Sequence, residues 1–112
     1  MDPSKGIKSL EKEGYNVKTY NISDLSSTFE NLSFEGFAIT DAYYGFKGKD
    51  EFFLAFYFSK ISEAREFLEA KDLLNTKALR EFASQKNEEH FVVGTYNNIA
   101  YAGTETTYAI VF

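Results

Sequence analysis

The sequence predicts an α+β domain built around an antiparallel sheet, and three observations lead to this prediction. The 112 residues are enough for one domain and too few for two ordinary ones, so residues 1–112 are expected to fold as a unit. Hydrophobic residues make up 44% and charged residues 26% of the chain, which is typical of a globular protein. Segments in which apolar residues alternate are interleaved with segments of helical periodicity, so strands and helices are both expected.

The N-terminal part is predicted to contain a helix, a strand and a short second helix. Asp2 can cap the first helix, Pro3 is tolerated at its first position, and Gly14 is placed to end it. Residues 15–20 alternate and are rich in strand-forming residues, which indicates a half-buried strand. Ser23 then caps a short helical pattern with the apolar positions Leu25, Phe29 and Leu32.

The middle of the chain is predicted to form a hairpin followed by a long helical region. Residues 37–46 and 51–59 are expected to be strands, and the two glycines in the polar stretch between them indicate the turn. Ser62 caps a helical region that runs to about residue 85. An unbroken helix would place Lys71 on its apolar face, so we expect a break near Asn75.

The C-terminal part is predicted to add a second hairpin. Residues 91–96 and 99–102 are expected to be strands joined by Asn97-Asn98, a pair that tolerates the positive φ of a tight turn. Residues 104–112 have two interpretations, because residues 107–112 have the composition of a strand whereas Thr104-Glu105 could open a helical turn.

The order of these elements predicts a topology. Strand, helix, strand, strand, helix, strand is the split βαβ pattern of ferredoxin-like folds, here with an extra N-terminal helix and an extra hairpin strand. We therefore expect an antiparallel sheet of four to five strands with helices on one face.

Charge and composition exclude several classes of function. Twelve Lys and Arg against 17 Asp and Glu give a net charge of −5, and no basic cluster offers a surface for nucleic acid. No segment approaches the roughly 20 apolar residues that cross a bilayer, and residues 1–20 hold no signal-peptide core. This absence by itself favours the cytoplasm, but a chain that begins just after a removed signal or lipid-anchor segment would look the same. The location stays open between the two, with a slight preference for one outside the cytoplasm.

Few residues could carry catalysis or hold a metal ion. Cysteine is absent, which excludes disulfides, thiolate metal sites and thiol catalysis. His90 is the only histidine, and at its predicted helix-to-strand junction it is explained as a cation that complements the helix dipole. A carboxylate site with Glu88 and Glu89 stays open, but neighbouring loop residues do not converge on one ion. The sequence predicts no catalytic residue, no metal site and no cofactor.

Asp41 lies in the middle of a predicted strand, where acidic residues are uncommon. If Phe37 and Ile39 face the core, Asp41 points the same way, and its carboxylate then needs a partner or a raised pKa. The alternative that we favour is a bulge or a strand end at Asp41 that turns the side chain towards solvent.

Aromatic residues are the main anomaly, since 12 Phe and 8 Tyr make up 18% of the chain. In the strand 51–59, one face carries Phe52, Leu54, Phe56 and Phe58, and the other carries Phe53, Ala55 and Tyr57. In the strand 37–46, one face carries Phe37, Ile39 and Tyr43, and the other carries Ala38, Ala42, Tyr44 and Phe46. A sheet that is covered on one side should alternate apolar with polar residues, and these strands do not. Either both faces are covered within the domain, or one face binds a partner.

The second possibility gives the first functional hypothesis. It is a non-enzymatic domain that binds a protein partner or self-associates through an aromatic sheet face made by Tyr43, Tyr44, Phe53 and Tyr57, with Asp41 beside them. The alternative is a small-ligand binder or a dimeric α+β-barrel enzyme with a cavity lined by aromatics and Asp41. Within the chain, residues 108–112 are a stronger candidate to cover this face than the N-terminal helix, whose apolar stripe is only Ile7 and Leu10.

Two segments carry a resemblance to a known group of proteins. Residues 10–17 (Leu-Glu-Lys-Glu-Gly-Tyr-Asn-Val), together with Val93-Gly94-Thr95 and residues 99–105, resemble parts of small uncharacterised exported or lipoprotein-type domains of low-GC Gram-positive bacteria. The resemblance covers about a quarter of the chain and contains no chemical motif. It implies an extracytoplasmic domain of no assigned activity with a short C-terminal helix, although Thr106-Thr107-Tyr108 departs from good helix composition.

Overall fold

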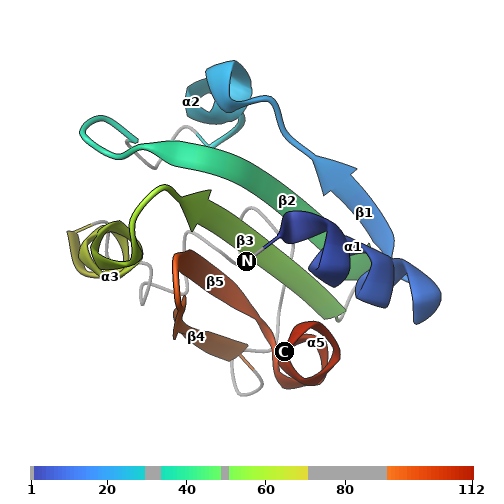
Figure 1. Cartoon of the computed structure of the whole chain (residues 1–112). Helices are drawn as coiled ribbons and strands as arrows, with labels where there is room; N and C mark the ends of the chain where they lie inside the picture. Colours follow the sequence, from blue (N-terminus) through green and yellow to red (C-terminus); the bar gives the residue numbers. More distant parts are fainter. Residues whose placement is uncertain (1, 30–33, 49–50, 71–90) are drawn as a thin grey trace.

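The computed structural model describes residues 2–29, 34–48, 51–70 and 91–112, in which a five-stranded antiparallel sheet lies between helices (Figure 1). The sheet has the order β1-β2-β3-β5-β4. The strands are β1 (Asn16–Thr19), β2 (Ile39–Lys47), β3 (Glu51–Phe58), β4 (Phe91–Tyr96) and β5 (Ile99–Thr104). The helices are α1 (Pro3–Lys12), α2 (Leu25–Thr28), α3 (Ile61–Ala70) and α5 (Glu105–Val111). Within the described ranges, no helix combines the length and the apolar character that a membrane crossing requires.

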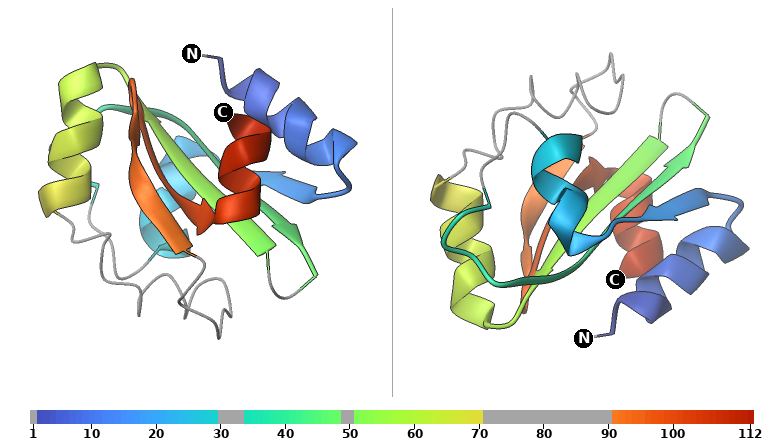
Figure 2. Two further views of the ribbon diagram at one scale, coloured as in Figure 1. Left: turned by 90° about the horizontal axis from the view of Figure 1, so that it is seen from below. Right: turned by 90° about the horizontal axis from the view of Figure 1, so that it is seen from above.

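Helices cover both faces of the sheet, which corrects the expectation that they lie on one face. Figure 2 shows α3 on one side of the sheet and α1 and α5 together on the other. The reason is the strand β3, in which every residue from Phe52 to Phe58 is buried, so that neither of its faces can be left in water. The ferredoxin-like topology is not confirmed, because β1 lies at the edge of the sheet and pairs with β2 alone.

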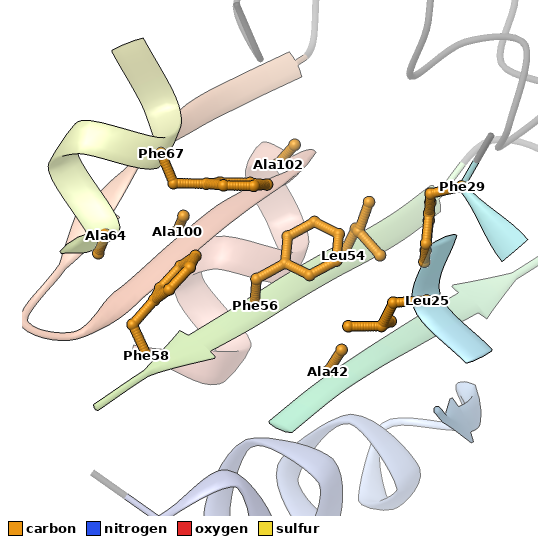
Figure 3. Close-up of a cluster of buried hydrophobic side chains, with 10 residues drawn as sticks. All are labelled: Leu25, Phe29, Ala42, Leu54, Phe56, Phe58, Ala64, Phe67, Ala100 and Ala102. Carbon is orange, nitrogen blue, oxygen red and sulfur yellow. The ribbon is translucent and has the colours of Figure 1, made fainter. Parts of the chain in front are cut away.

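Two hydrophobic clusters, one on each face, result from this arrangement. The first cluster joins β3 and β5 to α2 and α3, and Figure 3 shows Phe67 of α3 lying over Phe56 and Phe58 of β3. The ring centres of Phe67 and these two residues are 5.5 and 5.2 Å apart. The second cluster joins the opposite face to α1 and α5 and contains Leu10, Tyr15, Tyr43, Phe53, Ala55, Tyr57, Ile99, Tyr101 and Val111. The alternation predicted for β3 is thus confirmed.

A bulge in β2 changes which residues share a face. Ile39 pairs with Phe58 and Asp41 pairs with Tyr57, so Thr40 is an extra residue without a counterpart on β3. Ile39 therefore packs against the first cluster, whereas Tyr43 belongs to the second. The prediction that Ile39 and Tyr43 lie on one face was wrong, because one inserted residue exchanges the two faces for the rest of the strand.

The signals at the ends of elements give a mixed outcome. The Asp2 carboxylate accepts a hydrogen bond from the Ser4 N–H (2.9 Å) at the start of α1, and Gly14 ends that segment with a φ of 89°. The helix expected after Ser23 is shorter than predicted, since a 3-10 turn precedes a four-residue α2. The break expected near Asn75 lies outside the described residues.

The C-terminal segment forms the helix α5 and not a strand. The buried side chain of Thr107 stabilises the first turn of this helix. This side chain is fully buried, and its hydroxyl donates a hydrogen bond to the Thr104 carbonyl oxygen at 2.6 Å, with the Phe52 carbonyl oxygen 3.2 Å away. A threonine hydroxyl that bonds to the backbone three residues earlier suits the first turn of a helix. Thr107 thus connects the start of α5 to β3.

Thr107→Val is expected to lower the free energy of unfolding by about 1–2 kcal/mol, because an isosteric side chain loses this hydrogen bond in a buried place. Chemical denaturation measures the change. Thr28→Val, in the exposed end of α2, is the matched control and should leave stability nearly unchanged. Equal effects of the two substitutions would contradict the role given to Thr107.

Candidate functional site

The residues predicted to form an aromatic binding face do not form a surface. Tyr43, Phe53 and Tyr57 are exposed by 1%, 0% and 1%, and they lie in the second cluster under α1 and α5. Tyr44 is half-buried on the opposite side of the sheet, packed against the first cluster. The structure therefore does not bring these four side chains to one exposed face, and it covers three of them from within the chain.

Asp41 is half-buried, and the bulge places it opposite Tyr57 instead of under α3. Directly opposed residues of an antiparallel pair point to the same face, so Asp41 lies on the side of the second cluster. Burial raises the pKa of Tyr57, and the nearby carboxylates of Asp41 and Asp2 add to the increase. Because a tyrosine with a raised pKa stays protonated at neutral pH, Tyr57 is poorly suited to act as a general base.

The helix α1 covers this face more closely than its two apolar residues suggested. Its Leu10 is fully buried, and Gly6, one turn earlier on the same side of the helix, is buried as well. A Cβ at Gly6 would overlap the Tyr43 hydroxyl, so glycine is what lets the helix backbone approach this ring. The spacing of Gly6 and Leu10 was the available signal, but a glycine in a helix is not recognised as a contact until its neighbour is known.

Tyr43 itself has an unusual environment. Its hydroxyl is buried and makes no hydrogen bond among the described residues. Its ring centre lies 6.0 Å from that of Phe53 and 5.9 Å from that of Tyr57. Burial, with a further contribution from Tyr57, raises the pKa of Tyr43 far above its ordinary value. A buried hydroxyl without a hydrogen bond of ordinary geometry is energetically unfavourable.

A polar cluster lies where α5 begins. The Thr106 hydroxyl donates a hydrogen bond to the Glu51 carboxylate at 2.5 Å, and the Thr104 hydroxyl is 3.4 Å from that of Thr106. Burial raises the pKa of the nearby Tyr15, and Lys47 lies 5.5 Å from the centre of its ring. These contacts join the start of β3, the start of α5 and the turn after α1, which is a structural role.

Metal and histidine chemistry finds no support in the described part of the chain. Within it, no group of three His, Cys, Asp or Glu side chains could hold a metal ion. His90, Glu88 and Glu89 lie outside the described residues.

An exposed group of aromatic rings remains at the junction of α5 and β4. Four large apolar residues of the described chain are exposed, and two of them, Tyr96 (43%) and Tyr108 (39%), both contact Phe112. The ring centre of Phe112 is 4.7 Å from that of Tyr96 and 5.2 Å from that of Tyr108. We call Tyr96, Tyr108 and Phe112 the tyrosine patch.

The tyrosine patch rests on the core. Tyr101, which is 8% exposed, lies 5.2 Å from Phe112 and 5.5 Å from Tyr108 between ring centres. Phe53, fully buried in β3, stacks on Tyr101 at 5.9 Å. Sequence reasoning missed this site because it left residues 104–112 between strand and helix. The spacing of Tyr108 and Phe112, four residues apart, becomes meaningful only once the segment is helical.

No protein-family model, curated protein or solved structure matches the chain. The resemblance to exported domains therefore stays an expectation, and the functional argument rests on the geometry of the chain itself.

The contact between α1 and β2 can be tested with Tyr43→Phe and Gly6→Ala. Tyr43→Phe should raise the free energy of unfolding by about 1 kcal/mol, because it removes a buried hydroxyl that has no partner. Gly6→Ala should lower it by about 1–2 kcal/mol, since the added methyl group overlaps that hydroxyl and outweighs the gain in helix propensity.

The double variant is the control for this pair. In the Tyr43→Phe background, Gly6→Ala should lose most of its destabilising effect, because the overlapping atom is gone. Strictly additive effects in chemical denaturation would show that the two residues do not interact.

The buried tyrosines predict unfolding in alkali. Burial raises the pKa of Tyr20 to about 12, and it also raises the pKa values of Tyr43, Tyr44 and Tyr57, against 10.0 for an ordinary tyrosine. Since the folded chain favours the neutral phenols, the stability that they contribute is complete below pH 10 and is lost as the pH rises from 10 towards about 12.

Tyrosinate absorbance and circular dichroism, followed together, measure this effect. The chain has no tryptophan to obscure the phenolate signal. Most tyrosines should ionise only as the fold is lost, and Tyr20→Phe should move the midpoint to higher pH. Ionisation of all eight tyrosines near pH 10 in an intact fold would contradict the prediction.

Proposed function

We propose that this chain is a non-enzymatic protein-interaction domain that contacts its partner through the tyrosine patch. The observation that carries the proposal is the exposure of Tyr96 and Tyr108, by 43% and 39%, on a series of ring contacts that reaches the core through Tyr101 and Phe53. Tyrosine is enriched among the residues that contribute most to protein interfaces. Rings that are already held in place also lose little conformational entropy when a partner binds.

The charges near the patch favour a protein partner over a nucleic acid. The chain has a net charge of −5, β4 contains no charged residue, and Glu105 is the single charged residue of α5. A nucleic-acid surface would need a basic frame around its aromatic residues. An uncharged strand beside exposed tyrosines instead resembles the centre of a protein interface, from which charges are depleted.

The alternative function, a ligand cavity lined by aromatics and Asp41, has less support. The helices α1 and α5 pack directly on Tyr43 and its neighbours, and Gly6 brings the α1 backbone against the Tyr43 hydroxyl. Because these helices pack on the aromatic face, its side chains belong to the core and do not line a cavity for a ligand.

A displayed library of random peptides tests the proposal, because such peptides tend to select the surface that is best suited to binding. Peptides selected on the native chain should bind Tyr96→Ser and Tyr108→Ser about tenfold more weakly or worse, since each substitution removes an interface ring. Ile61→Ser, at an exposed apolar residue of α3, is the matched control and should bind as the native chain does.

Two results would refute the proposed surface. The first is selected peptides that keep full affinity for both tyrosine variants. The second is a selection in which only Ile61→Ser reduces binding. Circular dichroism of each variant shows that a loss of binding is not a loss of fold.

A further inference from the structure

The two edges of the sheet differ in a way that matters for association. β1, at one edge, has four residues and carries the charged Lys18, and three of its four residues are exposed. β4, at the other edge of the sheet that the described residues form, has six residues from Phe91 to Tyr96, without a charge or a proline. Its pairing with β5 is regular along all six positions, so no bulge twists it away. Soluble proteins usually protect an edge strand with a charge, a proline or a bulge, and in β4 these are missing.

We propose that β4 pairs with β4 of a second copy of this chain, antiparallel and around a two-fold axis, which joins two five-stranded sheets into one. The inference rests on the proposed function in one respect: the tyrosine patch beside β4 forms part of the same interface. It names the partner that the proposed function leaves open.

A second copy suits this edge because antiparallel pairing of a strand with itself is self-complementary. Val92, Val93, Thr95 and Tyr96 supply the β-branched and aromatic side chains that stabilise cross-strand pairs. The distribution of charge also favours contact along β4 over contact along a charged surface. Two copies that each carry −5 repel each other, and they can approach most easily along a strip that has no charge.

The tyrosine patch extends the contact beyond the strand. Tyr96 ends β4 and contacts Phe112, the residue that follows α5, and Phe112 in turn contacts Tyr108 of α5. A two-fold axis perpendicular to the joined sheet keeps both patches on the same side. A strand of six residues is about 20 Å long. Pairing along one such strand buries only a small part of the roughly 800 Å² that a standard interface buries on each partner. The patch adds area, and we expect a weak and reversible dimer.

Thr95 in β4 and Thr19 in β1 provide matched variants, one on each edge. Light scattering after size exclusion and sedimentation velocity, up to about 1 mM chain, should show a native dimer that dissociates on dilution. Thr95→Lys should be monomeric over this range, because it puts a charge on the uncharged edge and close to its copy. Thr19→Lys should dimerise as the native chain does.

A spin label gives a second measurement that does not depend on weakening the interface. The chain has no cysteine, so Thr95→Cys and Thr19→Cys each provide a single labelling position. Nitroxides at residue 95 should show dipolar broadening that disappears when unlabelled chain is added in excess. Nitroxides at residue 19 should show none.

The outcomes separate this inference from the proposed function. A native chain that is monomeric at about 1 mM overturns the inference, as does a dimer that Thr95→Lys leaves intact or that broadens only the label at residue 19. If Thr95→Lys does not fold, the spin labels decide. If the native chain is monomeric even at about 1 mM and selected peptides still bind it through Tyr96 and Tyr108, the proposed function is supported and the dimer is rejected.

Discussion

The strand β3 imposes the constraint on which the rest of the structure depends. Seven successive residues, Phe52 to Phe58, are exposed by at most 1%, and alternate side chains point to opposite faces. A strand of this kind cannot lie on the surface of a two-layer domain, because burying one phenylalanine side chain is worth about 1.5–3 kcal/mol. A short chain must therefore supply cover for both faces of the sheet.

The two ends of the described chain supply one of these covers. The helices α1 and α5 lie side by side on the second cluster (Figures 1 and 2), although they are far apart in the sequence. Neither helix has a wide apolar face, and a different residue lets each one pack closely against the sheet. In α1 this residue is Gly6, which has no side chain at the point where the helix contacts Tyr43. In α5 it is Thr107, whose hydroxyl bonds to the backbone at the start of the helix.

The sequence predicted those features that depend on local pattern. The two faces of β3, the Asp2 cap and the end of α1 at Gly14 all follow from spacing within a few residues. Features that depend on distant partners were not predictable in the same way. The acidic Asp41 in mid-strand indicated the bulge beside it, but its effect on the rest of β2, which moves Tyr43 to the other face, was not predicted. The helix α5 contradicts the strand preference of its residues, because tertiary contacts through Thr107 and Val111 outweigh propensity.

The same constraint moves the candidate site from the face of the sheet to its rim. Once α1 and α5 cover Tyr43 and Phe53, aromatic side chains can reach a partner only where the covering layer ends. That boundary lies at β4 and the last turn of α5, where the ring contacts from Phe53 through Tyr101 to Phe112 come to the surface. A ring in this position packs on the core beneath it and keeps part of its surface exposed. The aromatic residues of the sequence therefore fall into two groups. Most are buried and form the core on both faces of the sheet, and those of the tyrosine patch lie at its rim and pack against that core.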